Sequence, residues 1–208
     1  MKTLKVPNHL GEITLKQYQE FASKGEEVTN EEIVSIFCKI TLEEVLQLPA
    51  HAYEQAVVLL GELLQQSTTN QELIQTFKLN GTQYGMIPNL EEITYGENKD
   101  LVAYLADWKT MHMAMSVLFR PIDIKAGQTY SIEKYEGTSS HRDIMIHMPL
   151  DIVMSAQSFF YNLTEALLHA IPSYLEQVQR ESNSKTVQSS KDQQTQEEYI
   201  KQTGDPMM

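Results

Sequence analysis

An Asn80-Gly81 pair between two short apolar runs constrains the fold of this chain more than any other feature. Both residues tolerate the positive φ of a type I′ turn, which makes Asn-Gly the strongest short signal for a β-hairpin. The flanking runs, 73–79 and 82–87, are therefore predicted to be antiparallel strands. A two-stranded hairpin is marginal in water, so we expect it to pack on helices or to pair with Leu4-Lys5-Val6.

Capping boxes predict where helices begin in the first half of the chain. In a capping box, the threonine hydroxyl accepts a hydrogen bond from the backbone N–H three residues later. The side chain of a Gln or Glu at that later position accepts the backbone N–H of the threonine in return. An apolar-periodic run follows each box. A fourth helix is predicted to begin near Pro49. N–H groups in the first turn of a helix have no intrahelical partner, so the missing N–H of a proline costs nothing there. The three boxes are Thr14-x-x-Gln17, Thr29-x-x-Glu32 and Thr41-x-x-Glu44.

Helical spacing of apolar residues dominates the second half as well. Residues 94–119 are predicted to be mostly helical, with a stop at Pro121. We expect Gly96-Glu97-Asn98 to loosen the start of this segment and Asp107 to divide it. Another long helix is predicted to begin at Pro149.

The composition changes at the end of the chain, where Ser, Gln, Thr and Lys dominate from Ser182 on. Too little apolar surface remains there to offset chain entropy. Residues 183–208 are therefore predicted to be a disordered polar tail. The fold class predicted for residues 1–182 is a single, mainly α domain with one small β-hairpin or short antiparallel sheet near 73–87.

The acidic composition argues against two classes of partner. The 208 residues carry a formal net charge of -12. This disfavours nucleic acid, whose binding needs Lys and Arg to displace counterions, and it disfavours anionic lipid. No window reaches 18 uncharged apolar residues. The nearest, 149–170, contains Asp151, Asn162 and Glu165 and is interpreted as a buried helix, so no membrane span is predicted. The single cysteine, Cys38, is interpreted as a small buried hydrophobe.

Motifs for catalysis, cofactors and metals are missing from the sequence. The six histidines make no His-x-x-x-His pair, and one cysteine excludes the usual structural zinc patterns. Met111-His112-Met113 is interpreted as flexible core filling rather than as a soft-metal site. Adjacent glutamates point roughly 100° apart on a helix and are interpreted as solvated helix starts. We predict no catalytic, cofactor-binding or metal-binding residues, and hence no enzyme.

The candidate partner-binding residues are Tyr84, Ile87, Pro88 and Tyr95. They lie in the corner between the predicted hairpin and the following helix, where a loop is expected. Aromatic residues are enriched at interface hot spots. For Tyr84 and Tyr95, core packing and a role at an interface both stay open.

The same corner carries a resemblance to a group of small proteins from tailed bacteriophages, especially crAss-like and related phages. The similarity covers roughly residues 70–170, and Gly96-Glu97-Asn98-Lys99 departs from its pattern. The matching residues are Asn80-Gly81-x-x-Tyr84-Gly85-Met86-Ile87-Pro88-Asn89-Leu90, Ile93-Thr94-Tyr95-Gly96, Asp107-Trp108, Leu118-Phe119-Arg120-Pro121, Met148-Pro149-Leu150-Asp151 and Phe159-Phe160-Tyr161-Asn162-Leu163.

This resemblance implies a virion component or a morphogenesis factor such as a tail assembly chaperone, which acts by protein–protein interaction. The implied partners are other phage structural proteins of the portal, tail or tape-measure class, and a homo-oligomer stays open. The implied location is the virion or the host cytoplasm. The resemblance supplies no catalytic residues. The alternative function is a phage adaptor or inhibitor that binds a host factor.

Overall fold

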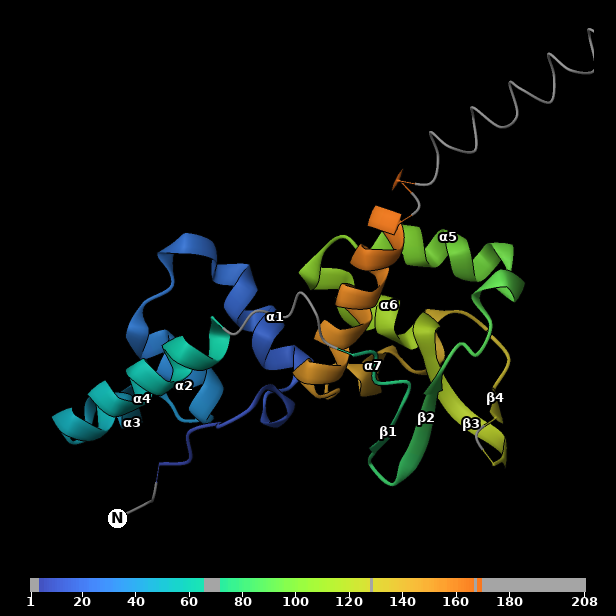
Figure 1. Ribbon diagram of the computed structural model, residues 1–208. Helices are drawn as coiled ribbons and strands as arrows, with labels where there is room; N and C mark the ends of the chain where they lie inside the picture. The colour runs from blue at the N-terminus through green and yellow to red at the C-terminus, as the bar shows by residue number, and fades with distance from the viewer. Residues whose placement is uncertain (1–3, 66–71, 128, 167, 170–208) are drawn as a thin grey trace, which may run out of the picture. The chain divides into compact units, whose positions relative to one another are not determined.

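The computed structural model describes residues 4–65, 72–127, 129–166 and 168–169. Within these ranges the chain is mainly helical and contains one four-stranded antiparallel sheet (Figure 1). This architecture confirms the predicted fold class. The predicted tail, residues 183–208, lies outside the described residues.

The first part of the chain is a series of helices whose starts were predicted correctly. The three predicted capping boxes are present at the first three α-helices, with both reciprocal hydrogen bonds in each. Pro49 is the N-cap of the fourth. The elements are η1 (Leu10–Glu12), α1 (Leu15–Lys24), η2 (Gly25–Glu27), α2 (Asn30–Cys38), α3 (Leu42–Leu46) and α4 (Ala50–Leu64).

The sheet joins the predicted hairpin to two later strands. Asn80 and Gly81 have φ angles of 49° and 87°, as the predicted turn requires. The strand order is β1 (Thr76–Leu79), β2 (Thr82–Met86), β3 (Phe119–Ala126) and β4 (Thr129–Ile132), with each neighbouring pair antiparallel. The expectation that Leu4-Lys5-Val6 pairs with the hairpin is wrong, because β3 occupies the free side of β2 and residues 4–6 form no strand.

The segment over 94–119 is divided at Asp107, as predicted. The Asp107 side chain accepts the N–H of Lys109 at 2.9 Å and caps the turn that follows. The expected loosening at Gly96 is wrong, because Thr94 and Glu97 form a fourth capping box. The elements are η3 (Leu90–Glu92), α5 (Tyr95–Tyr104), η4 (Trp108–Thr110), α6 (Met111–Leu118), η5 (Thr138–Ser140), α7 (Arg142–Met145) and a helix over 150–166.

Residues Met1–Phe159 form one unit, and Phe160–Met208 are grouped in a second. In the first unit, backbone hydrogen bonds join the start of α1 to the start of the helix over 150–166. Leu15 N–H donates to the Met148 carbonyl at 2.8 Å, and Leu150 N–H donates to the Ile13 carbonyl at 2.9 Å. The core of the sheet centres on Phe119. Its ring packs edge-on against the ring of Phe77, with the two ring centroids 5.4 Å apart.

Candidate functional site

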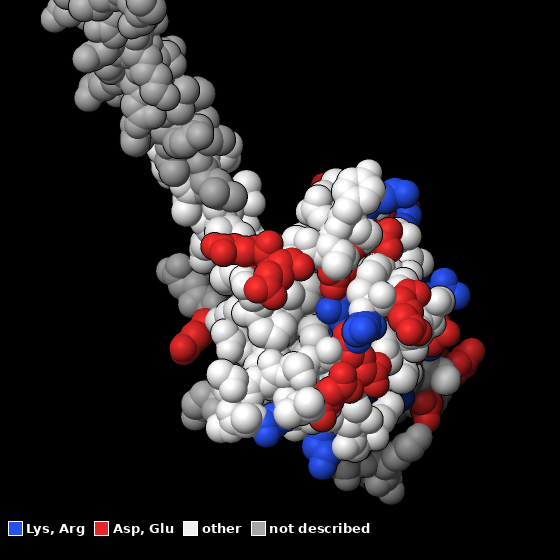
Figure 2. Space-filling model, turned by 90° about the vertical axis from the view of Figure 1, so that its right-hand side faces the viewer, with Lys and Arg blue, Asp and Glu red and all other residues white. Residues whose placement is uncertain are grey.

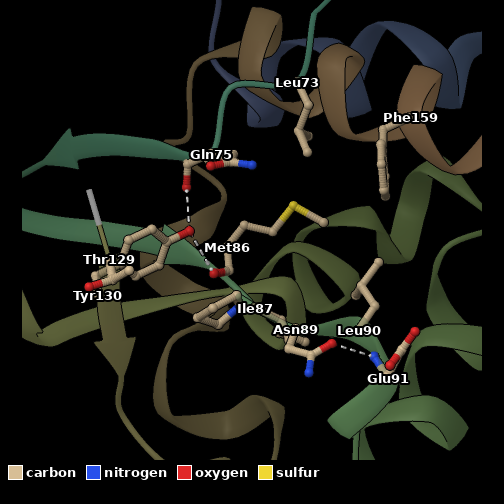
Figure 3. Close-up of a pocket in the computed structure, with 11 residues that line it drawn as sticks. Leu73, Gln75, Met86, Ile87, Asn89, Leu90, Glu91, Thr129, Tyr130 and Phe159 are labelled. Carbon is tan, nitrogen blue, oxygen red and sulfur yellow. Dashed lines mark hydrogen bonds between the residues drawn. The ribbon is translucent and has the colours of Figure 1, made fainter.

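The corner that follows β2 borders a cavity of about 430 Å³. Ile87 and Pro88 line it directly after β2, Leu73 and Gln75 line it just before β1, and Phe159 contributes from the helix over 150–166. In Figure 3 the side chains of Leu73, Met86, Leu90 and Phe159 point toward one another. The cavity therefore has apolar walls that come from three separate stretches of the chain.

Tyr130 of β4 forms the polar part of the cavity. Its hydroxyl donates to the carbonyl of Met86 at 2.9 Å and lies 3.4 Å from the carbonyl of Gln75 (Figure 3). Burial raises the pKa of Tyr130. The hydroxyl is therefore protonated at neutral pH. Its contacts with the Met86 and Gln75 carbonyls hold the Tyr130 side chain of β4 against β2 and the residue before β1.

Gly85 of β2 makes room for the Tyr130 ring. A Cβ atom at this position would overlap Cε2 of Tyr130 and would lie 2.9 Å from Cδ2 of the same ring. It would also lie 3.0 Å from Cγ1 of Ile122. Any side chain at this position forces the tyrosine or the strand to move, which would change the shape of the cavity.

We expect Gly85→Ala to lower the free energy of unfolding by about 1–3 kcal/mol, the usual cost of forcing extra atoms into packed structure. Urea denaturation of the purified protein measures this change. Gly61→Ala is the matched control, because a Cβ on Gly61 of α4 meets nothing within 4 Å. The control is expected to be neutral or stabilising. An equal loss in both variants would contradict the steric role of Gly85.

A buried ion pair fixes the helix that follows the corner. Nη1 of Arg120 lies 2.6 Å from Oε1 of Glu97, and the two side chains are 7% and 6% exposed. The Thr94 hydroxyl donates to the same carboxylate at 2.6 Å. Burial acts to raise the pKa of Glu97, but the hydrogen bonds from Thr94 and Arg120 outweigh it and the net pKa is lowered. Glu97 is therefore ionised at neutral pH.

Tyr135 extends this pair into a network. Its ring lies 5.6 Å from the guanidinium carbon of Arg120, and its hydroxyl donates to Asp100 of α5. Burial, followed by the hydrogen bond to Asp100, raises the pKa of Tyr135 far above its usual range. The network connects α5, which carries Glu97 and Asp100, to the start of β3, which carries Arg120. It therefore fixes the position of α5, the helix that follows the corner.

The four predicted partner-binding residues do not share one surface. Ile87 and Pro88 line the cavity. Tyr84 lies on β2, inside the run 82–87 that was predicted to be a strand, so placing it on the loop of the corner was wrong. Its side chain is only 3% exposed, and its ring stacks on Phe77. Tyr95 is the first residue of α5, is 83% exposed and does not line the cavity. Tyr84 is therefore a core residue, whereas Tyr95 is free to meet a partner.

Sequence reasoning missed several residues of the cavity. Leu73, Tyr130 and Phe159 are far apart in sequence, and no local signal brings them together. By contrast, the box formed by Thr94 and Glu97 has the same spacing as the three boxes that were recognised. That signal was present in the sequence, but the neighbouring Gly96 was interpreted as loosening the start of the helix, so the capping box was not predicted.

The charged groups on the surface are mixed in sign. On the face shown in Figure 2, acidic and basic side chains are interspersed with uncharged areas, and Lys and Arg do not gather into one patch. Burial raises the pKa of the Cys38 thiol to about 11, so this cysteine is protonated at neutral pH. In the described part of the chain, no group of three or more His, Cys, Asp or Glu side chains is placed to hold a metal ion.

Over the same described ranges, no helix has both the length and the apolar character needed to cross a membrane. The comparisons with known proteins give no relative. No family model, no curated protein and no solved structure matches this chain.

Proposed function

We propose that this chain is a bacteriophage structural or morphogenesis protein, a virion component or tail assembly chaperone, that acts by binding other proteins without catalysis. The observation that carries the binding role is the cavity of about 430 Å³ beside Ile87 and Pro88. Concave, mostly apolar sites of this size accept an anchoring side chain of a partner. The phage context rests on the sequence resemblance alone, and with it the partners of the portal, tail or tape-measure class.

Polar groups in the walls of the cavity already form hydrogen bonds within the chain, which supports a protein ligand over a polar small molecule. The carbonyls of Gln75 and Met86 face the hydroxyl of Tyr130. The Asn89 side chain accepts the N–H of Glu91 at 3.0 Å. Because these polar groups are already engaged within the chain, the apolar side chains of Leu73, Ile87 and Leu90 contribute much of the contact available to an occupant. That property suits an apolar anchor residue better than a substrate that must be oriented by hydrogen bonds.

We expect Ile87→Gln to reduce the recovery of phage structural proteins by about tenfold, which corresponds to roughly 1.4 kcal/mol of binding free energy. The chain is affinity-tagged, purified from infected cells and analysed by quantitative mass spectrometry. Ile124→Gln is the matched control, because Ile124 is 69% exposed and lies on β3 outside the cavity. It is expected to leave recovery unchanged.

Three outcomes oppose the proposal or its link to the cavity. Absence of the chain from purified virions, combined with recovery of no portal, tail-tube or tape-measure protein, would refute the phage assembly role. Recovery of one host protein in place of phage proteins would favour the adaptor or inhibitor alternative. Equal losses for Ile87→Gln and Ile124→Gln would separate the binding role from the cavity.

A further inference from the structure

We propose that a groove among α2, α3 and α4 binds an amphipathic helix of a partner protein, with acidic residues on one flank of its apolar stripe and basic residues on the other. The inference rests on the proposed protein-binding role. It concerns a different part of the chain from the cavity beside Ile87, and it names the chemistry of the occupant.

The groove is larger than the cavity beside Ile87, with a volume of about 700 Å³. Its apolar residues lie mainly in the connections between helices. Ile40 follows α2, Leu48 and Pro49 connect α3 to α4, and Ala52 lies in the first turn of α4. Leu4 adds an apolar side chain from the N-terminal segment. These residues offer a floor on which several apolar side chains of a partner can pack.

The connection after α2 is held rigidly. Lys39 adopts the left-handed conformation, with φ 56° and ψ 46°, and ends α2. The N–H of Ile40 then donates to the Ser35 carbonyl at 3.2 Å, and the Ser35 hydroxyl donates to the Ile40 carbonyl at 2.7 Å. Both backbone groups of Ile40 are thus tied to one residue of α2. The floor of the groove is therefore preformed, which reduces the entropy lost on binding.

Charges of opposite sign border the groove from different elements. Lys5 and Lys39 come from the N-terminal segment and the end of α2, whereas Glu43 and Glu44 come from α3. Lys5 is 82% exposed and pairs with Glu12 at 3.3 Å, an exposed pair that salt and solvent weaken. A segment with both signs of charge can therefore meet an opposite charge from each of these two sets of residues. A uniformly basic or acidic segment meets a like charge from one of the two sets.

The local secondary structure favours a helix over an extended segment as the occupant. An added strand gains much of its affinity from backbone hydrogen bonds to a free sheet edge. The described residues 4–65 include no strand of the sheet. A helix satisfies its own backbone and presents apolar side chains at positions i, i+3, i+4 and i+7 on one face. It therefore needs only the apolar floor and charged borders that this groove provides.

Three labelled peptides of about 18 residues, long enough to form a helix, test the proposal by fluorescence anisotropy with the full chain. They share one leucine stripe and differ only in its flanks: Glu on one side and Lys on the other, Lys on both, or Glu on both. We expect the mixed peptide to bind about fivefold more tightly than either of the others, as a few exposed ion pairs allow.

Variants of the chain identify the surface that binds. Glu43→Lys is expected to abolish the advantage of the mixed peptide over the peptide with Glu on both flanks, because the new lysine cancels the charge of Glu44. Glu54→Lys makes the same charge change on α4 outside the groove, and it should leave the order unchanged. Ala52→Lys places a long side chain in the groove and should weaken binding about tenfold. Ala103→Lys, on the exposed side of α5, is its matched control.

Equal affinity of the three peptides overturns the proposal, as does binding that Ala52→Lys leaves unchanged. Two other occupants would also overturn it. A dimer that Ala52→Lys converts to a monomer would place a second copy on the groove. Tighter peptide binding after deletion of residues 183–208 would place the chain's own tail there. The assay contains no phage protein, so its failure and the failure of the proposed assembly role are separate results.

Discussion

Replacing Arg120 by methionine is expected to lower the free energy of unfolding by about 3–5 kcal/mol, the usual cost of removing one partner from a buried ion pair. Methionine keeps an unbranched apolar stem but leaves the Glu97 carboxylate without its charge partner, at a site where both side chains are less than one-tenth exposed. The contact with the Tyr135 ring loses its cationic component as well. Urea denaturation at neutral pH measures the change.

The pH dependence of this loss provides an internal check. Because the pKa of Glu97 is lowered in the folded state, its ionised form stabilises the protein above pH 4.5, its ordinary pKa, and this stability is lost as the pH falls further. In Arg120→Met the isolated carboxyl can be protonated, so the difference from wild type shrinks between pH 7 and about pH 3.

The double variant Glu97→Gln/Arg120→Met controls for the loss of side-chain bulk. It removes both charges, and it should recover part of the stability lost in Arg120→Met. A loss below about 1 kcal/mol in Arg120→Met, within the range of exposed pairs, would mean that the pair is solvated. No recovery in the double variant would mean that packing, not charge, explains the loss.

Phe119→Ala is expected to lower the free energy of unfolding by about 3–5 kcal/mol, since it creates a cavity in the core. Phe119 has 0% exposure, follows α6 directly and meets the Phe77 ring at 5.4 Å. It also pairs in register with Met86, so its loss weakens the pairing of β3 with the hairpin. Urea denaturation followed by circular dichroism measures the change.

Ile124→Ala is the matched control for Phe119→Ala. Ile124 lies on the same strand but is 69% exposed. Its replacement should change the free energy of unfolding by no more than about 0.5 kcal/mol, as is usual for surface positions. A similar loss in the two variants would show that β3 contributes through its backbone pairing and not through the buried ring.

The junction of α6 and β3 is a place where the sequence predicted the helix end incorrectly and did not predict the strand. Pro121 was interpreted as the stop of a helix, but the helix ends at Leu118 and the proline lies within β3. The proline lies near the start of β3 and beside the end of β4 at Ile132, where little of the ladder needs its missing N–H, and its carbonyl accepts the N–H of Glu133 at 2.9 Å. β4 follows β3 closely in the chain, but β2 lies before α5 and α6, so the pairing of β3 with β2 could not be recognised from neighbouring residues.

Tyr84 illustrates the same limit for the candidate site. Its position beside an Asn-Gly turn predicted a strand, yet its side chain was left open between core and interface. Pairing of β2 with β3 buries it, since Tyr84 lies opposite Pro121 and its ring stacks on Phe77. Ile87 and Pro88, named as partner-binding candidates, line the cavity, but the cavity beside them also needs Tyr130 and Phe159.

Local signals in the sequence were sufficient for the capping boxes and the Asn80-Gly81 turn, because each depends on bonds between residues at most four positions apart. The helices and the hairpin recognised in this way were enough to predict the fold class. The partner of β2, the pair of Glu97 with Arg120 and the walls of the cavity join residues that are distant in the chain. Such contacts depend on how helices and strands pack against one another. They become visible only when the chain is seen folded, because many arrangements satisfy the same local preferences.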